Sequence, residues 1–151
     1  MKIWVDGDAC PVVIKDILYK AAERTGVELT LVADRFVRMP SLPGLKFLRV
    51  KPGLDAADNE IVKRMGRGDL VITGDIPLAA EVVEREGFAL SPRGELYSAE
   101  NIRDRLSMRD FMDSLRASGI ETGGPPALSR GDNKKFASQL DKLLTRYAGN
   151  S

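Results

Sequence analysis

Aspartates are the residues of this chain whose types and spacing can support a reaction. Asp6 and Asp8 lie one residue apart at the end of a short apolar run, and Asp75 ends a second apolar run. The chain contains no histidine, and Cys10 is its single cysteine. Histidine-assisted nucleophiles and zinc sites with paired cysteines are therefore excluded. A hydrolytic reaction in this chain must use carboxylates, lysines, hydroxyl groups or a cofactor.

The overall charge limits the kind of partner. The 151 residues carry a formal net charge of +1, whereas proteins held to nucleic acid by a broad basic face are usually more positive. Any phosphate contact is therefore expected to be local. No apolar run approaches the roughly 20 residues that a membrane-spanning helix needs, and no export signal is recognisable. We expect a cytoplasmic protein with no membrane partner, and its oligomeric state stays open.

Strand-like and helix-like patterns alternate along the chain, and together they must position the aspartates. Apolar runs typical of buried strands lie at 2–5, 28–34, 45–50 and 69–75, with a weaker fifth at 88–92. Continuous Val, Ile and Leu strands favour a parallel sheet. The alternation predicts right-handed crossovers and an α/β fold in which helices cover both faces of a doubly wound sheet.

The helical patterns are amphipathic. Pro11 and Gly26 delimit the first of them. Further helices are expected at 54–65, at 77–86 with Gly87 closing it, within 98–119 as one long or two short helices, and after residue 133. The chain 1–151 is therefore expected to form a single domain, with 98–151 as a helical C-terminal extension packed on it.

Charged residues follow the expected strands, at the edge of the sheet where ligands bind in open α/β folds. They are Asp6 and Asp8, Asp34 and Arg35, Lys51, Asp75, and Arg93. Some have structural explanations: Asp75 can cap the helix that follows it, and Asp8 can be a turn residue near a helix start. Asp6 is expected to be partly buried, where an unpaired charge costs free energy.

Asp58 favours a shared site over separate structural roles. Its position falls on the expected apolar stripe of the second helix, so its side chain is predicted to point inward. The stripe consists of Leu54, Ile61, Val62 and Met65. Asp55 can serve as the N-cap of that helix, although a capping-box role remains an alternative for Asp58.

Carboxylates that meet in one place raise each other's pKa values unless a cation joins them. Oxygen ligands without His or Cys suit Mg²⁺ or Mn²⁺. Such an ion lowers the pKa of a bound water and stabilises charge at a phosphorus centre, which replaces the missing histidine in phosphodiester hydrolysis.

Five ordered motifs resemble a known family. They are "DGDACPV", "LDAADNEIV", "GDLVITGDIPLAAEVV", "PRGELYSAENI" and "LSRGDNKKFASQLD", and they span nearly the whole chain. This set resembles the bacterial YaiI/YqxD family, which is itself similar to PIN-domain nucleases. The resemblance implies a PIN-like domain, a Rossmann-like three-layer α/β/α sandwich with an acidic metal site.

Carried over to this sequence, the PIN pattern places an aspartate that ends the first strand at Asp6. Its acidic residue on the central helix falls on Asp58 or Asp55, and its Thr-x-Asp pattern falls on Thr73 and Asp75. The resemblance therefore implies Asp6, Asp58 and Asp75 as catalytic residues.

The fourth PIN acid has no counterpart among residues 76–79, so Asp8 or Asp55 must take its place if the centre is complete. The expected metal ligands are thus Asp6, Asp8, Asp55, Asp58 and Asp75. Thr73, Arg93 and Arg130 are candidates for contacts with substrate phosphates.

The leading hypothesis is a Mg²⁺- or Mn²⁺-dependent nuclease or phosphodiesterase that acts on RNA. A haloacid-dehalogenase-like phosphatase is an alternative, because Asp6-x-Asp8 is similar to its nucleophile and acid/base pair, although the acid expected four residues after Asp75 is missing. A non-catalytic PIN-like module that binds RNA or a protein is the third hypothesis.

Overall fold

A six-stranded sheet in the order β3-β2-β1-β4-β5-β6 forms the centre of the computed structural model, which describes residues 1–123 and 127–148. The strands are β1 (Lys2–Asp6), β2 (Glu28–Ala33), β3 (Leu45–Arg49), β4 (Leu70–Ile72), β5 (Phe88–Leu90) and β6 (Leu96–Tyr97). Neighbouring strands are parallel except for the antiparallel pair β5 and β6. The predicted α/β fold with a mainly parallel sheet is confirmed.

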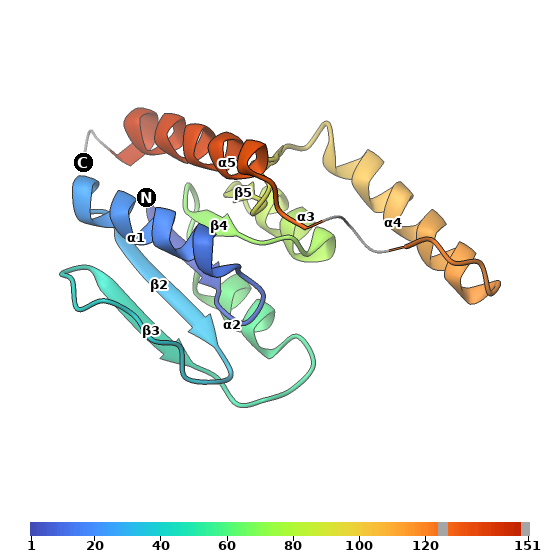
Figure 1. Ribbon diagram of the computed structural model, residues 1–151, viewed down its shortest axis with the longest axis horizontal. Coiled ribbons are helices and arrows are strands. Elements are labelled where there is room, and N and C mark those ends of the chain that lie inside the picture. The colour runs from blue at the N-terminus through green and yellow to red at the C-terminus, as the bar shows by residue number, and fades with distance from the viewer. Residues whose placement is uncertain (124–126, 149–151) are drawn as a thin grey trace.

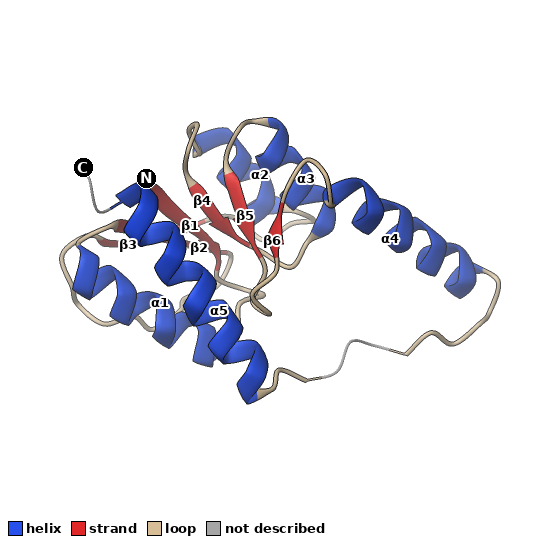
Figure 2. Cartoon of the chain, turned by 90° about the horizontal axis from the view of Figure 1, so that it is seen from above, coloured by secondary structure: helices blue, strands red, loops and turns tan. Residues whose placement is uncertain are grey.

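Helices cover both faces of the sheet (Figures 1 and 2). They are α1 (Val12–Thr25), α2 (Ala56–Arg64), α3 (Ile76–Glu84), α4 (Ile102–Ala117) and α5 (Arg130–Leu143), and α5 continues into a π-helical turn η1 (Leu144–Ala148). α1 and α5 lie over one face, and α2 and α3 lie over the other. The arrangement is that of a three-layer α/β/α sandwich.

Alternation along each central strand divides the core into two halves. In β1, Ile3 and Val5 pack toward α1 and α5, whereas Trp4 packs toward α2 and α3. β4 repeats the pattern, since Leu70 and Ile72 belong to the first half and Val71 to the second. This follows from the two-residue period of a strand. Because both faces are buried, the strands are continuous apolar runs, which is why they were recognisable in the sequence.

The antiparallel strand β6 was not predicted. It contains only Leu96 and Tyr97, which pair with Leu90 and Ala89 of β5. Two residues are too few to produce a recognisable periodicity, so this strand is decided by the pairing with β5.

The last two helices differ in how they meet the body of the protein. In α5, Phe136, Leu140 and Leu143 are buried against α1 and the sheet. In α4 only Ile102 is buried, and the rest of the helix projects away from the sheet (Figures 1 and 2). None of the helices within 1–123 and 127–148 combines the length and apolar character needed to cross a membrane.

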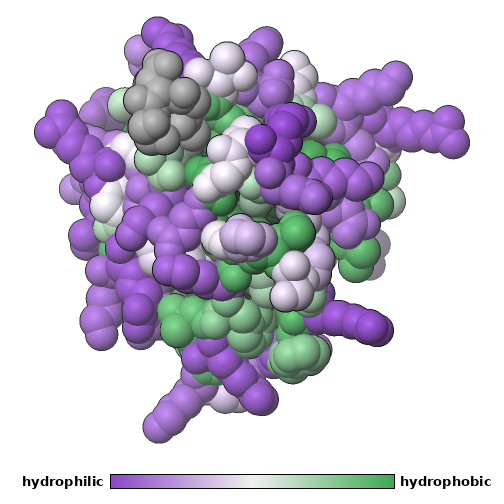
Figure 3. Space-filling model, turned by 90° about the vertical axis from the view of Figure 1, so that its left-hand side faces the viewer, coloured by the Kyte–Doolittle hydropathy of each residue, from purple (hydrophilic) through white to green (hydrophobic). Residues whose placement is uncertain are grey.

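Charged and polar side chains dominate the face at the end of the molecule away from α4, with hydrophobic side chains visible between them (Figure 3). Several large apolar side chains elsewhere are also exposed, and they include Val12, Phe36, Met108 and Phe111. Single exposed apolar residues are ordinary on protein surfaces.

Asp69 stabilises the edge of the sheet at which β1 and β4 begin. Its buried carboxylate accepts hydrogen bonds from the backbone N–H groups of Lys2, at 3.0 Å, and Gly66, at 2.8 Å, and from Nε1 of Trp4, at 3.1 Å. A buried carboxylate with three N–H donors is well satisfied. Asp69 therefore joins β1, β4 and the end of α2 as a structural residue.

Two details of the predicted helices are wrong. Leu54 precedes α2 and is 94% exposed, so the apolar stripe of that helix does not include it. Gly87 does not supply the left-handed residue after α3; Glu86 does, with φ of 65°. A Cβ on Gly87 would lie 3.0 Å from Cγ1 of Val82 and 3.1 Å from the backbone O of Asp69, so glycine allows the backbone to approach its neighbours closely there.

Candidate metal centre

Five predicted metal ligands lie at one edge of the sheet, beyond the carboxyl ends of the central strands. A cavity of about 220 Å³ is lined by Asp6, Asp8, Asp34, Asp55, Asp58 and Asp75, together with Gly53, Ala56 and Ala57. Asp34 is the single additional acid in this set. The chain therefore brings together aspartates that are up to 69 residues apart in the sequence.

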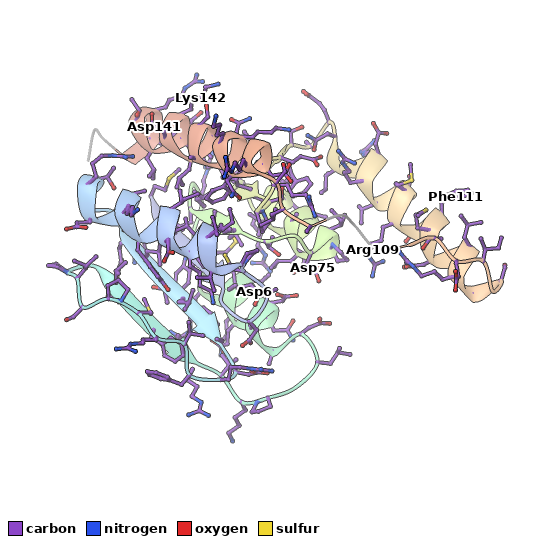
Figure 4. The ribbon with its side chains drawn as sticks, viewed as in Figure 1. Asp6, Asp75, Arg109, Phe111, Asp141 and Lys142 are labelled. Carbon is purple, nitrogen blue, oxygen red and sulfur yellow. The ribbon has the colours of Figure 1, made fainter. Side chains whose placement is uncertain are left out.

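Strand pairing places Asp6 beside the end of β4. β1 and β4 are parallel neighbours in the register Val5 to Ile72. The chain therefore passes Asp6 and Thr73 at the same level of the sheet, and Asp75 follows at the start of α3. Figure 4 shows Asp6 and Asp75 on this side of the molecule.

The entry into α2 positions two more carboxylates. Asp55 occupies the N-cap position but adopts a left-handed conformation with φ of 58°, and its side chain makes no capping hydrogen bond. Asp58 lies in the first turn, one turn before the fully buried Ile61. Asp55 therefore stands at the expected N-cap position, but its side chain does not cap the helix. Positive φ is uncommon for residues other than glycine, although aspartate adopts it more readily than most.

Asp75 has two roles in the structure. Its Oδ1 accepts a hydrogen bond from the backbone N–H of Leu78 at 2.9 Å, so the residue caps α3. The backbone N–H of Asp75 donates to Oγ1 of Thr73 at 3.0 Å, which fixes the loop between β4 and α3. The capping explanation and the site explanation are therefore compatible, because a carboxylate has a second oxygen.

Asp55, Asp58 and Asp75 form the tightest group, which we call the acid cluster. One carboxylate oxygen from each lies within 4.8 Å of the others. Within residues 1–123 and 127–148, no Lys or Arg side chain forms an ion pair with any member of this cluster. Three carboxyl groups thus face one another without a compensating cation among the described residues.

The electrostatic consequence is largest at Asp58. Burial, and then the negative charges of Asp6, Asp75 and Asp55, raise the pKa of Asp58 to about 7. Burial and the charges of Asp8 and Asp75 also raise the pKa of Asp6. Raised carboxylate pKa values are expected where like charges meet away from water, and they are enriched at functional sites.

Asp8 lies at the rim of the cavity. Its Oδ2 accepts a hydrogen bond from the backbone N–H of Asp34 at 2.9 Å, and its Oδ1 is 3.9 Å from Nε of Arg35. Arg35 is also 3.6 Å from Oδ1 of Asp34. The side chain of Asp8 is therefore held by the segment that follows β2.

The three expected phosphate contacts lie in different places. Thr73 is buried, and its hydroxyl oxygen already accepts the N–H of Asp75. Nη1 of Arg93 donates to Oδ2 of Asp132 at 2.9 Å, and Asp132 belongs to the capping box of α5. Arg130 is exposed at the first residue of α5. The described residues that line the acidic cavity do not include Arg93 or Arg130, and their phosphate contacts stay predictions.

A neighbouring cavity of about 200 Å³ continues from the acid cluster to α4, and the sequence did not indicate it. Besides the cluster it is lined by Asn59, Pro77, Leu78, Glu81 and Arg109. Arg109 lies 34 residues after Asp75 on a mainly exposed helix. Only the packing of α4 against α3 brings its side chain to the site, so no local sequence signal could have revealed it.

Comparisons with known proteins identify the family. A sequence profile described as "Uncharacterized BCR, YaiI/YqxD family" matches residues 4–146. The chain belongs to the YaiI/YqxD family. It is 67% identical over 147 residues to a UPF0178 protein of Syntrophotalea carbinolica, which covers 97% of this chain and 99% of that protein. It is 64% identical over 148 residues to a UPF0178 protein of Hydrogenovibrio crunogenus, covering 98% of both chains. No solved structure matches the chain.

In this member of the YaiI/YqxD family, the donors of the acid cavity are carboxylate oxygens. Hard divalent cations with oxygen preference, Mg²⁺ and Mn²⁺, suit such a set. The chemistry of this cavity is therefore inferred from its donor atoms and its geometry.

Proposed function

We propose that this protein is a PIN-like, Mg²⁺- or Mn²⁺-dependent phosphodiesterase that cleaves RNA. The observation that carries the proposal is the acid cluster, in which three carboxylates meet within 4.8 Å without a basic partner among the described residues. A charge arrangement of this kind is costly in the folded protein. A divalent cation bound there would be coordinated by the carboxylates and would offset the repulsion between them.

The aspartates of the site have different roles in this proposal. Asp58, Asp75 and Asp6 would hold the cation, and Asp55 and Asp8 would supply further carboxylate oxygens. When bound, the cation supplies a Lewis acid that lowers the pKa of a water and stabilises negative charge at phosphorus. Asp58 carries a proton in part at neutral pH, because its pKa is about 7, and it must release this proton to become a ligand. The cap to Leu78 holds Asp75 in place throughout.

The arrangement favours a phosphodiesterase over a phosphatase that uses Asp6 as nucleophile. That mechanism needs Asp8 as a mobile acid and base beside Asp6. Here Oδ2 of Asp8 already accepts the N–H of Asp34, and Arg35 lies 3.9 Å from Oδ1. Both contacts hold the Asp8 side chain against the segment that follows β2, so it is not free to move beside Asp6 as that mechanism requires. Trapping of a phosphoryl group on Asp6 would overturn this preference.

The test combines metal binding with cleavage. Purified protein is titrated with Mn²⁺ while its thermal unfolding is followed, and it is then incubated with a fluorescent single-stranded RNA. We expect Mn²⁺ to raise the melting temperature, because a ligand of the folded state stabilises it by mass action. Cleavage should require the metal and stop in EDTA.

Charge-removing variants connect both results to the site. Asp58→Asn should abolish cleavage and most of the Mn²⁺-dependent stabilisation. Asp104→Asn is the matched control, because Asp104 is an exposed aspartate of α4 that does not line either acidic cavity. RNA binding without cleavage and without a Mn²⁺ effect would instead establish the non-catalytic module.

A further inference from the structure

The acid cluster lies between two cavities that share its three aspartates. The first reaches the strand ends at Asp6 and Asp8, and the second reaches α3 and α4 at Glu81 and Arg109. In Figure 4, Asp6, Asp75 and Arg109 follow one another across the molecule in this order. The two cavities therefore form one continuous path over the cluster, with a different chemical character at each end.

Arg109 gives the second cavity its positive charge. Its Nη1 lies 3.6 Å from Oδ1 of Asp110 and 3.6 Å from Oδ2 of Asp113, and its side chain is 46% exposed. Both partners are exposed neighbours on the same helix, and such ion pairs stabilise proteins very little. The guanidinium group can therefore exchange these contacts for a stronger one with an anionic ligand.

We propose that Arg109 and Asn59 form a phosphate-binding subsite for a single RNA strand that crosses the acid cluster. This inference rests on the proposed phosphodiesterase function and adds where the strand runs. The phosphate held by Arg109 is the neighbour of the one that is cleaved. A planar guanidinium with several donors is well suited to bind phosphate oxygens in pairs, and the amide of Asn59, which lines the same cavity, adds a neutral donor.

The shape of the path favours a single strand. The subsite is a cavity of about 200 Å³ lined by residues of α2, α3 and α4, a volume too small to hold both strands of a duplex. Single-stranded RNA is also the form in which proteins can separate and contact individual nucleotides. The projecting helix α4 would thus contribute to RNA binding, because it supplies Arg109 from outside the sheet.

Glu81 lines the same cavity as Arg109 and carries the opposite charge. A phosphate bound by Arg109 would be repelled by Glu81. Loss of the Arg109 charge and loss of the Glu81 charge should therefore change RNA affinity in opposite directions. A purely structural role for Arg109 does not predict this pair of effects.

The experiment measures binding and cleavage separately. The full-length protein in Mn²⁺ is titrated against a fluorescent single-stranded RNA with cleavage-resistant phosphorothioate linkages, and anisotropy gives the dissociation constant at several salt concentrations. We expect Arg109→Ala to weaken binding about tenfold, as the loss of one charged hydrogen-bonding group does. The slope of log affinity against log salt should become shallower by about 0.7, which is the value for one phosphate contact on a single strand.

Further variants test whether the charge and the shape of the Arg109 side chain cause the change in RNA affinity. Arg109→Lys should bind between the wild type and Arg109→Ala, because it keeps the charge and loses the planar fork. Glu81→Gln should bind more tightly than the wild type. Arg103→Ala is the control, since Arg103 is an exposed arginine of the same helix and does not line the cavity. Its affinity and salt slope should equal those of the wild type.

The outcomes separate this inference from the proposed function. Equal affinities of Arg109→Ala and the wild type, or the absence of RNA binding by the wild type, would overturn the subsite. Cleavage of an ordinary RNA by the wild type with an unchanged KM in Arg109→Ala would overturn the subsite and leave the phosphodiesterase intact. Binding that depends on Arg109 while no RNA is ever cleaved would overturn the phosphodiesterase instead.

Discussion

The carboxylate of Asp75 accepts the backbone N–H of Leu78 at 2.9 Å while the same side chain belongs to the acid cluster. One oxygen caps α3 and the other remains for the site. Asp75, a proposed metal ligand, therefore also holds the loop between β4 and α3. The hydrogen bond to α3 in turn fixes the position of its carboxylate. Variants of Asp75 can therefore distinguish its contribution to the stability of α3 from its contribution to metal binding.

We predict that Asp75→Asn and Asp75→Ala differ in their free energies of unfolding but lose the same activity. Both substitutions remove one negative charge from the acid cluster, but asparagine is an equally good N-cap, so Asp75→Ala should have a free energy of unfolding about 1 kcal/mol lower than that of Asp75→Asn. Both variants should lose cleavage and most of the Mn²⁺-dependent rise in melting temperature. Urea unfolding in EDTA measures the first effect. Full Mn²⁺ stabilisation of Asp75→Asn would exclude Asp75 as a ligand.

The raised pKa of Asp58 predicts a specific pH dependence of stability without metal. The folded state keeps the proton of Asp58 up to about pH 7, whereas the unfolded chain loses it near pH 4. Between these values the folded state binds more protons, so the free energy of unfolding falls as pH rises. From pH 5 to pH 8 the loss due to this group is at most about 3 kcal/mol.

Asp58→Asn provides the comparison for that prediction. In EDTA the variant should be more stable than the wild type at pH 8, and the difference should shrink toward pH 5. Saturating Mn²⁺ should reduce the pH dependence of the wild type, because the bound cation keeps Asp58 ionised in the folded state. Parallel pH profiles of the wild type and the variant in EDTA would show that Asp58 does not titrate in this range.

Asp69 should matter for stability alone. Asp69→Ala removes the acceptor of three N–H groups and leaves Nε1 of Trp4 buried without its partner. We expect a loss of about 2–4 kcal/mol in the free energy of unfolding. Mn²⁺ should still raise the melting temperature of the variant, because Asp69 lies at the opposite edge of the sheet. A loss of metal stabilisation without a loss of stability would contradict the structural role.

Gly94 should be essential for the docking of α5. Its φ is 86°, and a Cβ there would lie 2.6 Å from the backbone N of Phe136 and 2.7 Å from the backbone C of Lys135. Gly94→Ala therefore combines backbone strain with a clash against a helix, and we expect a loss of more than about 2 kcal/mol.

Gly26→Ala is the control for Gly94→Ala. Gly26 also has a positive φ, of 75°, but a Cβ there meets nothing within 4 Å. It should lose only the cost of the left-handed conformation, about 1 kcal/mol. Urea unfolding of both variants measures the difference. Equal losses would mean that the loop containing Gly94 can move away from α5.

The sequence by itself determined the alternation of strands and helices, because both faces of the sheet are buried and the strands are continuous apolar runs. It also placed Asp6 and Asp75 at strand ends and Asp58 on the inward face of its helix. These assignments depend on local periodicity and on a general property of parallel sheets, so they needed no knowledge of contacts.

Only the tertiary structure decided the rest. It makes β1 and β4 neighbours, it turns Asp55 toward the cluster through a left-handed φ, and it brings Arg109 from a projecting helix to the same cavity. Strand pairing, helix docking and long-range charge repulsion are non-local, so they leave no periodic signal in the chain. For the same reason the local pattern misassigned Leu54 to the apolar stripe and could not reveal the short strand β6.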